Sequence, residues 1–147
     1  YDIDKLPEGV TVIVDEAHTK IGARDTATTE NKGFMALAGM ARQRGQSLLW
    51  LTHMARKIDP LAMGECKRWY YKMPTAAQVV FDRAEMKPFT ARALRAFQNV
   101  KGLPQKKVYV VDLENLVFSM VNVPLPTFWT SEMSKAMAKL HVEVKTA

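Results

Sequence analysis

The chain has 147 residues, of which 48% are apolar and 24% charged, with a net charge of +6. This composition is typical of a folded protein of about one domain. No apolar run is long enough to span a membrane, and the first residues lack the basic and apolar sections of a secretion signal. The single cysteine, Cys66, excludes an internal disulfide and argues against a cysteine-ligated zinc site, so a reducing, cytoplasmic setting fits best.

Positive charge is concentrated in the second half of the chain. Residues 1–65 carry 8 basic and 9 acidic side chains, whereas residues 66–147 carry 13 basic and 6 acidic ones. Within 83–107, seven basic residues face a single acid, Glu85. Such a distribution indicates either an anionic partner, most commonly nucleic acid, or a solvated surface that keeps the protein soluble.

The first part of the chain predicts a βαβ unit. Residues 10–14, VTVIV, and 47–52, SLLWLT, are short continuous apolar runs, typical of strands that are buried on both faces of a parallel sheet. Between them, polar residues 19–29 predict a loop, and 30–44 predicts an amphipathic helix that ends at Gly45. We therefore expect an α/β fold with a parallel sheet flanked by helices.

The remaining elements include a β-hairpin and a terminal helix. Residues 53–65 predict a short helix or an irregular segment, and 66–72, CKRWYYK, predict a third strand. An amphipathic helix is expected over 89–100, and the pattern of 107–123 predicts two strands joined by a turn. A last helix is expected to run through Leu140.

Polar side chains follow both strands of the predicted βαβ unit. Asp15 and Glu16 come directly after the first strand, and Thr52 and His53 end the second. In open α/β sheets, ligands bind outside the carboxyl ends of the strands. A strand-end aspartate can hold the water shell of a Mg²⁺ ion, and the following glutamate can polarise a water for attack on phosphate. A hydroxyl or imidazole on the neighbouring strand could then contact the γ-phosphate.

The stretch VTVIVDEAH resembles the Walker B strand of P-loop ATPases in which a catalytic glutamate follows the Mg²⁺ aspartate. A longer pattern more narrowly resembles the HerA/FtsK group of DNA-pumping ATPases, which includes viral genome-packaging ATPases. The pattern consists of VIVDEAH, then ARQRGQSLLWLTH, then KID..A..ECKRWYYKMP. The resemblance covers about residues 7–74 and implies a RecA-like (ASCE) sheet. It makes residues 1–126 the C-terminal part of a P-loop ATPase domain and 127–147 a terminal helix or tail.

The resemblance also implies roles for individual residues. Asp15 would bind Mg²⁺, Glu16 would activate the attacking water, and Thr52-His53 would stand where that group usually has Thr-Gln. Histidine is a departure from the pattern, and its protonation would matter near neutral pH. The implied cofactors are ATP and Mg²⁺, and the implied partners are DNA and further copies of the chain in a ring. Candidates for the arginine finger that reaches a neighbouring subunit's nucleotide are Arg42, Arg44 and Arg56.

The phosphate-binding loop of such ATPases does not occur in these residues. No G-x-x-x-x-G-K-[ST] is present, so the chain has neither the backbone cradle for the phosphates nor the lysine for the β- and γ-oxygens. Because that loop precedes the Walker B strand in the family, and the chain starts at Tyr1 rather than methionine, we expect an N-terminally truncated ATPase that is inactive alone. A virus- or plasmid-encoded origin is compatible with this expectation.

Two interpretations from other functional classes remain open. The first is a non-catalytic module with an ATPase-like sheet that binds nucleic acid or protein. The second is a metal-dependent nuclease built from Asp15, Glu16, His18 and His53, although such a site would lack a clear supporting set of acids. The string DEAH also suggests a DEAH-box helicase, but the Ser-Ala-Thr-like motif that follows this strand in those enzymes does not occur here.

The basic stretch 83–107 is the predicted DNA contact. Under the ATPase interpretation we expect it to bind DNA with a steep dependence on salt, because cations that neutralise phosphates release counterions. Its members are Arg83, Lys87, Arg92, Arg95, Lys101, Lys106 and Lys107.

Overall fold

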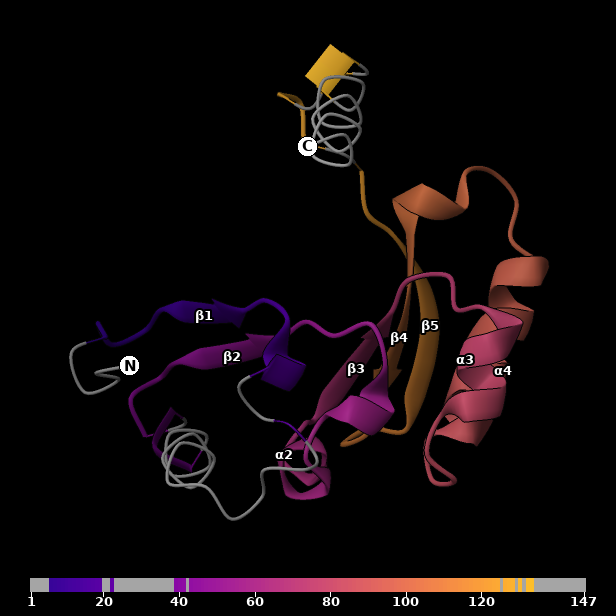
Figure 1. Ribbon diagram of the computed structural model, residues 1–147. Helices are drawn as coiled ribbons and strands as arrows, with labels where there is room; N and C mark the ends of the chain where they lie inside the picture. The colour runs from indigo at the N-terminus through magenta and orange to yellow at the C-terminus, as the bar shows by residue number, and fades with distance from the viewer. Residues whose placement is uncertain are drawn as a thin grey trace, which may run out of the picture.

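The computed structural model describes residues 6–19, 22, 39–41, 43–124, 126–128, 130 and 132–133. This part of the chain forms a parallel two-stranded sheet and an antiparallel three-stranded sheet with helices beside them (Figure 1), which confirms the expected α/β fold. None of its helices is long and apolar enough to cross a membrane. Most of the predicted loop at 19–29, most of the predicted helix at 30–44 and most of the last helix, to Leu140, lie outside the described residues.

The two strands of the predicted βαβ unit form and run parallel. β1 (Thr11–Val14) pairs with β2 (Ser47–Trp50) so that Val14 lies opposite Trp50. Successive side chains point to opposite faces of a strand, and the face with Val14 and Trp50 packs on a buried cluster. Ile13 points to the other face and is 61% exposed. The expected burial on both faces is therefore not met among the residues that the structure describes.

The buried cluster joins β1 and β2 to the segment that follows them. Its buried members are Ala17, Ile58 and Ala62. Ala62 lies on α2 (Pro60–Gly64), which begins with a proline because the first helical N–H needs no partner within the helix. The Asp59 side chain caps this helix by accepting a hydrogen bond from the Leu61 N–H at 2.8 Å. Of the two alternatives predicted for 53–65, a short helix or an irregular segment, the short helix is the one that forms.

The helix that precedes β2 ends before Gly45, as predicted. Residues 39–41 are helical, and Gly45 has φ = +62°, in the left-handed region where glycine carries no Cβ penalty. The Gln46 N–H donates to the Ala41 carbonyl at 2.8 Å, a hydrogen bond that is common where a helix ends on glycine. The chain then turns directly into β2.

The second sheet is antiparallel, with strand order β3-β4-β5. β4 (Lys107–Asp112) and β5 (Val117–Asn122) are the predicted hairpin. The predicted third strand also forms, as β3 (Arg68–Tyr71), but it pairs antiparallel with β4 and does not extend the parallel pair. Its aromatic residues favour a strand, whereas the choice of partner depends on contacts that lie far away in the sequence.

One face of this sheet is covered by α4, and α3 packs beside that helix (Figure 1). α3 (Ala76–Phe81) begins with a capping box in which Thr75 and Gln78 each bond the other's backbone N–H through a side-chain oxygen. α4 (Lys87–Gln98) is the amphipathic helix predicted at 89–100, and it begins two residues earlier.

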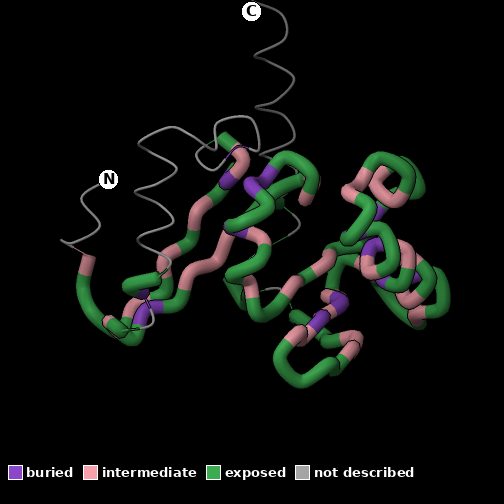
Figure 2. The backbone as a smooth tube through the Cα atoms, turned by 90° about the horizontal axis from the view of Figure 1, so that it is seen from below, coloured by how far each residue is buried: buried purple, intermediate pink, exposed green. Residues whose placement is uncertain are grey.

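The larger core lies between α4 and the antiparallel sheet. Its buried members are Ala93, Phe97, Tyr109 and Val111. Figure 2 shows buried residues as short, separate stretches along a backbone that is otherwise intermediate or exposed. Each fully covered side chain therefore contributes a large share of the packing in this part of the chain.

Replacement of Phe97 by alanine should destabilise the chain strongly. Deleting a buried phenylalanine removes apolar contacts and leaves a cavity, which typically costs about 3–5 kcal/mol of the free energy of unfolding. Urea unfolding followed by circular dichroism would measure the loss. Phe81→Ala is the matched control, because Phe81 is exposed and should cost far less. Equal losses in the two variants would contradict the packing of α4.

An ion pair joins β3 to the turn of the hairpin. Arg68 Nε donates to Asp112 Oδ2 at 2.9 Å, and the Asn115 N–H donates to Asp112 Oδ1 at 2.9 Å. These hydrogen bonds, that from Arg68 first, favour the charged carboxylate and lower the pKa of Asp112 to about 2. Asp112 therefore contributes stability that depends on pH.

Asp112→Asn should remove part of the acid sensitivity of the fold. A carboxyl whose pKa is lowered by folding stabilises the folded state at pH values above its unfolded pKa of about 4. That contribution is lost as the pH falls toward 2. The urea midpoint of the wild type should therefore decline more between pH 4 and pH 2 than that of Asp112→Asn. Glu114→Gln removes the other acid of this turn and should keep the wild-type decline. Parallel curves for wild type and Asp112→Asn would contradict this role.

Candidate functional site

The polar residues that follow β1 and β2 lie together at one edge of the parallel sheet. The Leu51 N–H donates to the Val14 carbonyl at 2.9 Å, and the Ala17 N–H donates to the Leu51 carbonyl at 2.8 Å. These hydrogen bonds continue the pairing beyond the strands. Asp15-Glu16 and Thr52-His53 therefore share the carboxyl edge, which is where ligands of open α/β sheets bind.

The backbone reverses sharply at Glu16. This residue has φ = +50°, a left-handed conformation that costs a residue other than glycine about 1–2 kcal/mol. Asp15 Oδ1 accepts the Glu16 N–H at 2.8 Å, and the Glu16 carbonyl accepts the Thr19 N–H at 2.8 Å across the short helix η2 (Ala17–Thr19). Backbone strain of this kind is concentrated at functional sites.

The reversal places the Glu16 carboxylate between two imidazoles. Its Oε2 lies 3.4 Å from His18 Nε2, and its Oε1 lies 3.5 Å from His53 Nε2. The side chains differ in exposure: Glu16 is 53% exposed, His18 17% and His53 82%. The sequence placed Glu16 near His53 under the ATPase interpretation, but it grouped His18 with them only under the nuclease interpretation. The spacing of two residues after Glu16 in a tight turn is the signal that could have indicated the direct contact of His18.

Thr52 and His53 are held by local and long-range hydrogen bonds. The Thr52 hydroxyl donates to the Met54 carbonyl at 3.2 Å and accepts the Met54 N–H at 3.4 Å. The His53 carbonyl accepts from Gln78 Nε2 at 2.8 Å, which ties this edge to the start of α3. The His53 imidazole itself stays exposed and can turn toward a ligand at the edge.

The described arginine-finger candidates are both engaged within the fold. Arg44 donates to the Leu6 carbonyl at 2.7 Å. Arg56, in the short helix η3 (Ala55–Lys57), donates to the Phe81 carbonyl at 3.3 Å, and its guanidinium lies 6.0 Å from the Phe81 ring centroid. Arg42, the third candidate, lies outside the described residues.

The basic residues of 83–107 fall into two groups. Those on α4 and around η4 (Pro104–Lys106) are exposed, and Arg92 also stacks on Phe118 with 3.8 Å between guanidinium and ring centroid. Arg83 is largely buried and donates to the carbonyls of Arg56 and Ile58. Lys107 donates to Asn122 across the hairpin. The exposed candidates for an anion contact are Lys87, Arg92, Arg95, Lys101 and Lys106.

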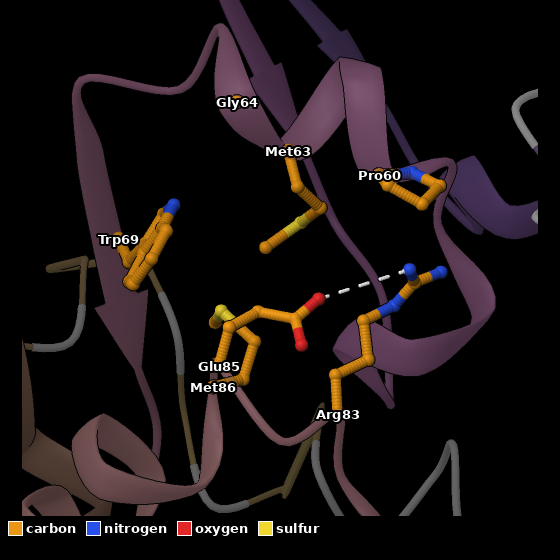
Figure 3. Close-up of a pocket in the computed structure, with 7 residues that line it drawn as sticks. All are labelled: Pro60, Met63, Gly64, Trp69, Arg83, Glu85 and Met86. Atoms are coloured by element: carbon orange, nitrogen blue, oxygen red, sulfur yellow. Dashed lines mark ion pairs between the residues drawn. The ribbon is translucent and has the colours of Figure 1, made fainter.

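A pocket of about 220 Å³ lies between α2, β3 and the turn before α4 (Figure 3). Figure 3 shows Arg83 and Glu85 facing each other there, with 4.0 Å between Nη1 and Oε1. None of the strand-end side chains lines this pocket, so it is separate from the candidate site. The lining residues are Pro60, Met63, Gly64, Trp69, Arg83, Glu85 and Met86.

The nuclease interpretation gains no support from the geometry. In the part of the chain that the structure describes, no three His, Cys, Asp or Glu side chains are placed to hold a metal ion. Cys66 is equally unsuited to chemistry, because burial and the neighbouring Glu65 raise the pKa of its thiol to about 11. A thiol with so high a pKa is protonated near neutral pH and is a poor nucleophile.

Known proteins resemble the chain in structure. No protein-family model matches it, and no curated protein matches its sequence. The genome packaging NTPase B204 from Sulfolobus turreted icosahedral virus 2 in complex with AMP matches with TM-score 0.58 and 14% identity over 80% of this chain and 55% of that chain. The same protein with ATP-gammaS gives TM-score 0.55 and 14% identity over 80% and 53%. The DNA-packaging ATPase B204 from Sulfolobus turreted icosahedral virus gives 0.55 and 15% over 78% and 52%.

These similarities establish the fold. The chain spans about half the length of the solved structures that it matches. At identities of 14–15%, the likeness does not transfer activity or substrates. The chain has the fold of a packaging ATPase, and the fold that its resemblance to HerA/FtsK-type P-loop ATPases implies is confirmed.

Proposed function

We propose that the chain is the part of an ATP-hydrolysing DNA translocase, of the genome-packaging type, that carries the metal-binding and water-activating acids. The observation that carries the proposal is the convergence of Asp15-Glu16 with Thr52-His53 at the carboxyl edge of β1 and β2. The shared fold with B204, a genome packaging NTPase solved with ATP-gammaS and AMPPCP, supports it. Phosphoryl transfer to water uses a carboxylate that holds the metal and a residue that orients the attacking water, and Asp15 and Glu16 would supply these two groups.

The donor chemistry of this edge suits Mg²⁺ with a nucleotide. Mg²⁺ prefers oxygen ligands and is commonly held by one or two carboxylates together with phosphates and waters. The Asp15 carboxylate is exposed, and although its Oδ1 accepts the Glu16 N–H, it keeps lone pairs for metal-bound waters. Glu16 is half-exposed, so a water can reach its oxygens. Thr52 and His53 would contact the γ-phosphate from the neighbouring strand.

The finger that completes such a site would come from another copy of the chain in a ring. Of the two described candidates, Arg56 is exposed and Arg44 is partly buried. Arg56 would have to release the Phe81 carbonyl to reach a neighbour's nucleotide. An exposed contact of this kind is weak enough to exchange, because stacking of a cation on an exposed ring contributes only about 0.5–1 kcal/mol.

A second candidate function is a non-catalytic module that binds nucleic acid or protein. The observation that favours it is the engagement of Arg44 and Arg56 within the fold, since an arginine finger must extend to the nucleotide of another subunit. In this case the Asp15-Glu16 turn would be structural. The two functions are separated by the effect of Glu16 on ATP hydrolysis.

The isolated 147-residue chain should not turn over ATP. The phosphate cradle would come from outside these residues, and without its amides and lysine the β- and γ-phosphates have no fixed position. Phosphate release by the purified chain with Mg²⁺ and ATP would measure this. Turnover that Glu16→Gln abolishes would contradict the expectation.

In the natural gene product that contains these residues, Glu16→Gln should lower kcat for ATP hydrolysis by about 10²-fold or more. A positioned general base contributes on the order of 10²–10⁴-fold, and an amide cannot take the proton. KM for ATP should change little, because Glu16 would act on the water and not on the nucleotide. Glu8→Gln, an exposed acid ahead of β1, is the matched control. A wild-type kcat in Glu16→Gln would leave the non-catalytic module as the better account.

DNA binding should depend steeply on salt and on the exposed cations near α4. Arg95→Gln with Lys101→Gln should weaken duplex binding and reduce the slope of log K against log salt by about 1 for each lost phosphate contact. These two are chosen because Arg92→Ala would also remove the stacking on Phe118. Lys57→Gln with Lys67→Gln removes the same charge elsewhere and should leave the slope unchanged. Fluorescence anisotropy with a labelled duplex measures both, and a salt-independent affinity would contradict the contact.

A further inference from the structure

We propose that His18 is a positioning residue that holds one oxygen of Glu16 and leaves the other for the attacking water. The inference rests on the proposed function, since it assigns how the water-activating acid is oriented. The contact that carries it is the 3.4 Å separation between His18 Nε2 and Glu16 Oε2. This separation is longer than the roughly 2.7–3.2 Å of an ordinary N–H···O hydrogen bond, and catalytic contacts are often long in this way before a ligand binds.

The two imidazoles beside Glu16 differ in how firmly they are held. The side chain of His18 is 17% exposed, whereas that of His53 is 82% exposed. A largely covered ring has few rotamers available, and an exposed ring can turn at little cost. His18 is therefore the fixed partner of Oε2, and His53 is the partner of Oε1 that a bound phosphate can draw away.

The backbone around His18 is anchored on both sides. Ala17 is fully buried, and its N–H donates to the Leu51 carbonyl at 2.8 Å. The Thr19 N–H donates to the Glu16 carbonyl at 2.8 Å, which closes η2 around His18. With Glu16 at φ = +50°, its side chain and the His18 ring are brought to the same side of the turn. The position of the ring is thus set by the sheet edge itself.

The surroundings of the other ring nitrogen favour one tautomer of His18. Nδ1 is buried and has no hydrogen-bond partner among the described residues. A proton on Nδ1 would leave a buried donor unsatisfied and would turn the bare Nε2 lone pair toward the Glu16 carboxylate. A proton on Nε2 points a donor at Oε2 and removes that repulsion, although Nδ1 is then a buried acceptor without a partner among the described residues. Glu16 and His18 therefore select each other's orientation.

The tautomer of His18 is measurable in the 147-residue chain without nucleotide. Imidazole ¹⁵N spectra distinguish protonated from bare ring nitrogens, and His18→Gln identifies the signal. We expect the Nε2–H tautomer in the wild type and a shift toward a mixture of tautomers in Glu16→Ala, with no change in Glu8→Ala. An Nδ1–H tautomer in the wild type, or a spectrum that Glu16→Ala does not alter, would overturn the proposal.

The catalytic consequence is tested in the natural gene product. His18→Ala should lower kcat by about tenfold with KM for ATP unchanged, because a misdirected base loses rate without loss of nucleotide binding. His18→Gln should restore most of kcat, since its amide nitrogen can donate from nearly the same place as Nε2. A purely structural role would lower the unfolding midpoint in both variants and would not separate kcat from KM.

The outcomes keep the two proposals apart. If Glu16→Gln abolishes hydrolysis while His18→Ala keeps wild-type kcat, the proposed function stands and the role of His18 fails. If the wild type does not hydrolyse ATP, the proposed function fails, and the imidazole spectrum still decides whether His18 holds Glu16.

Discussion

Two backbone hydrogen bonds beyond the last residues of β1 and β2 determine the geometry of the candidate site. The Leu51 N–H reaches the Val14 carbonyl, and the Ala17 N–H reaches the Leu51 carbonyl. Because Ala17 is drawn into the sheet edge and fully buried, the chain must reverse between Val14 and Ala17. Glu16 takes the left-handed conformation that allows this reversal, and its carboxylate is left on the edge where β2 delivers His53.

The strain at Glu16 persists because its neighbours determine the turn from several directions. A left-handed glutamate costs about 1–2 kcal/mol. Asp15 offsets part of that cost by accepting the Glu16 N–H, and Ala17 adds burial against Ile58 and Ala62. The side chain most expected to bind metal thus also supports the backbone of the side chain expected to activate water. Changing Asp15 would affect the orientation of Glu16 as well as any ion.

The sequence predicted the elements whose signals are local. Apolar runs located β1 and β2, the helical period located α4, and two strands around a polar turn located the hairpin. It could not predict that β3 pairs with β4, because strand pairing depends on contacts about forty residues apart. The strand-end acids were predicted from their order after β1. The sequence grouped His18 with Glu16 only under the nuclease interpretation, because their direct contact depends on φ at Glu16. Counting charges likewise placed Arg83 with the surface cations, whereas it binds carbonyls inside the fold.

The strand-end site and the basic helix α4 belong to different sheets, so a motor built on them needs a rigid connection between the two. α3 supplies one, because it packs on α4 and its Gln78 donates to the His53 carbonyl at 2.8 Å. The other end of the same amide accepts the Thr75 N–H in the capping box, so the side chain cannot turn without losing both bonds. A displacement of α3 relative to β2 would therefore break the bond or move His53. Contiguous contact does not by itself establish coupling, because coupling requires an element with two stable positions that both sites influence. The imidazole of His53 is 82% exposed and lies 3.5 Å from Glu16 Oε1, while its backbone is held by Gln78, and it is the element at this edge best suited to that role.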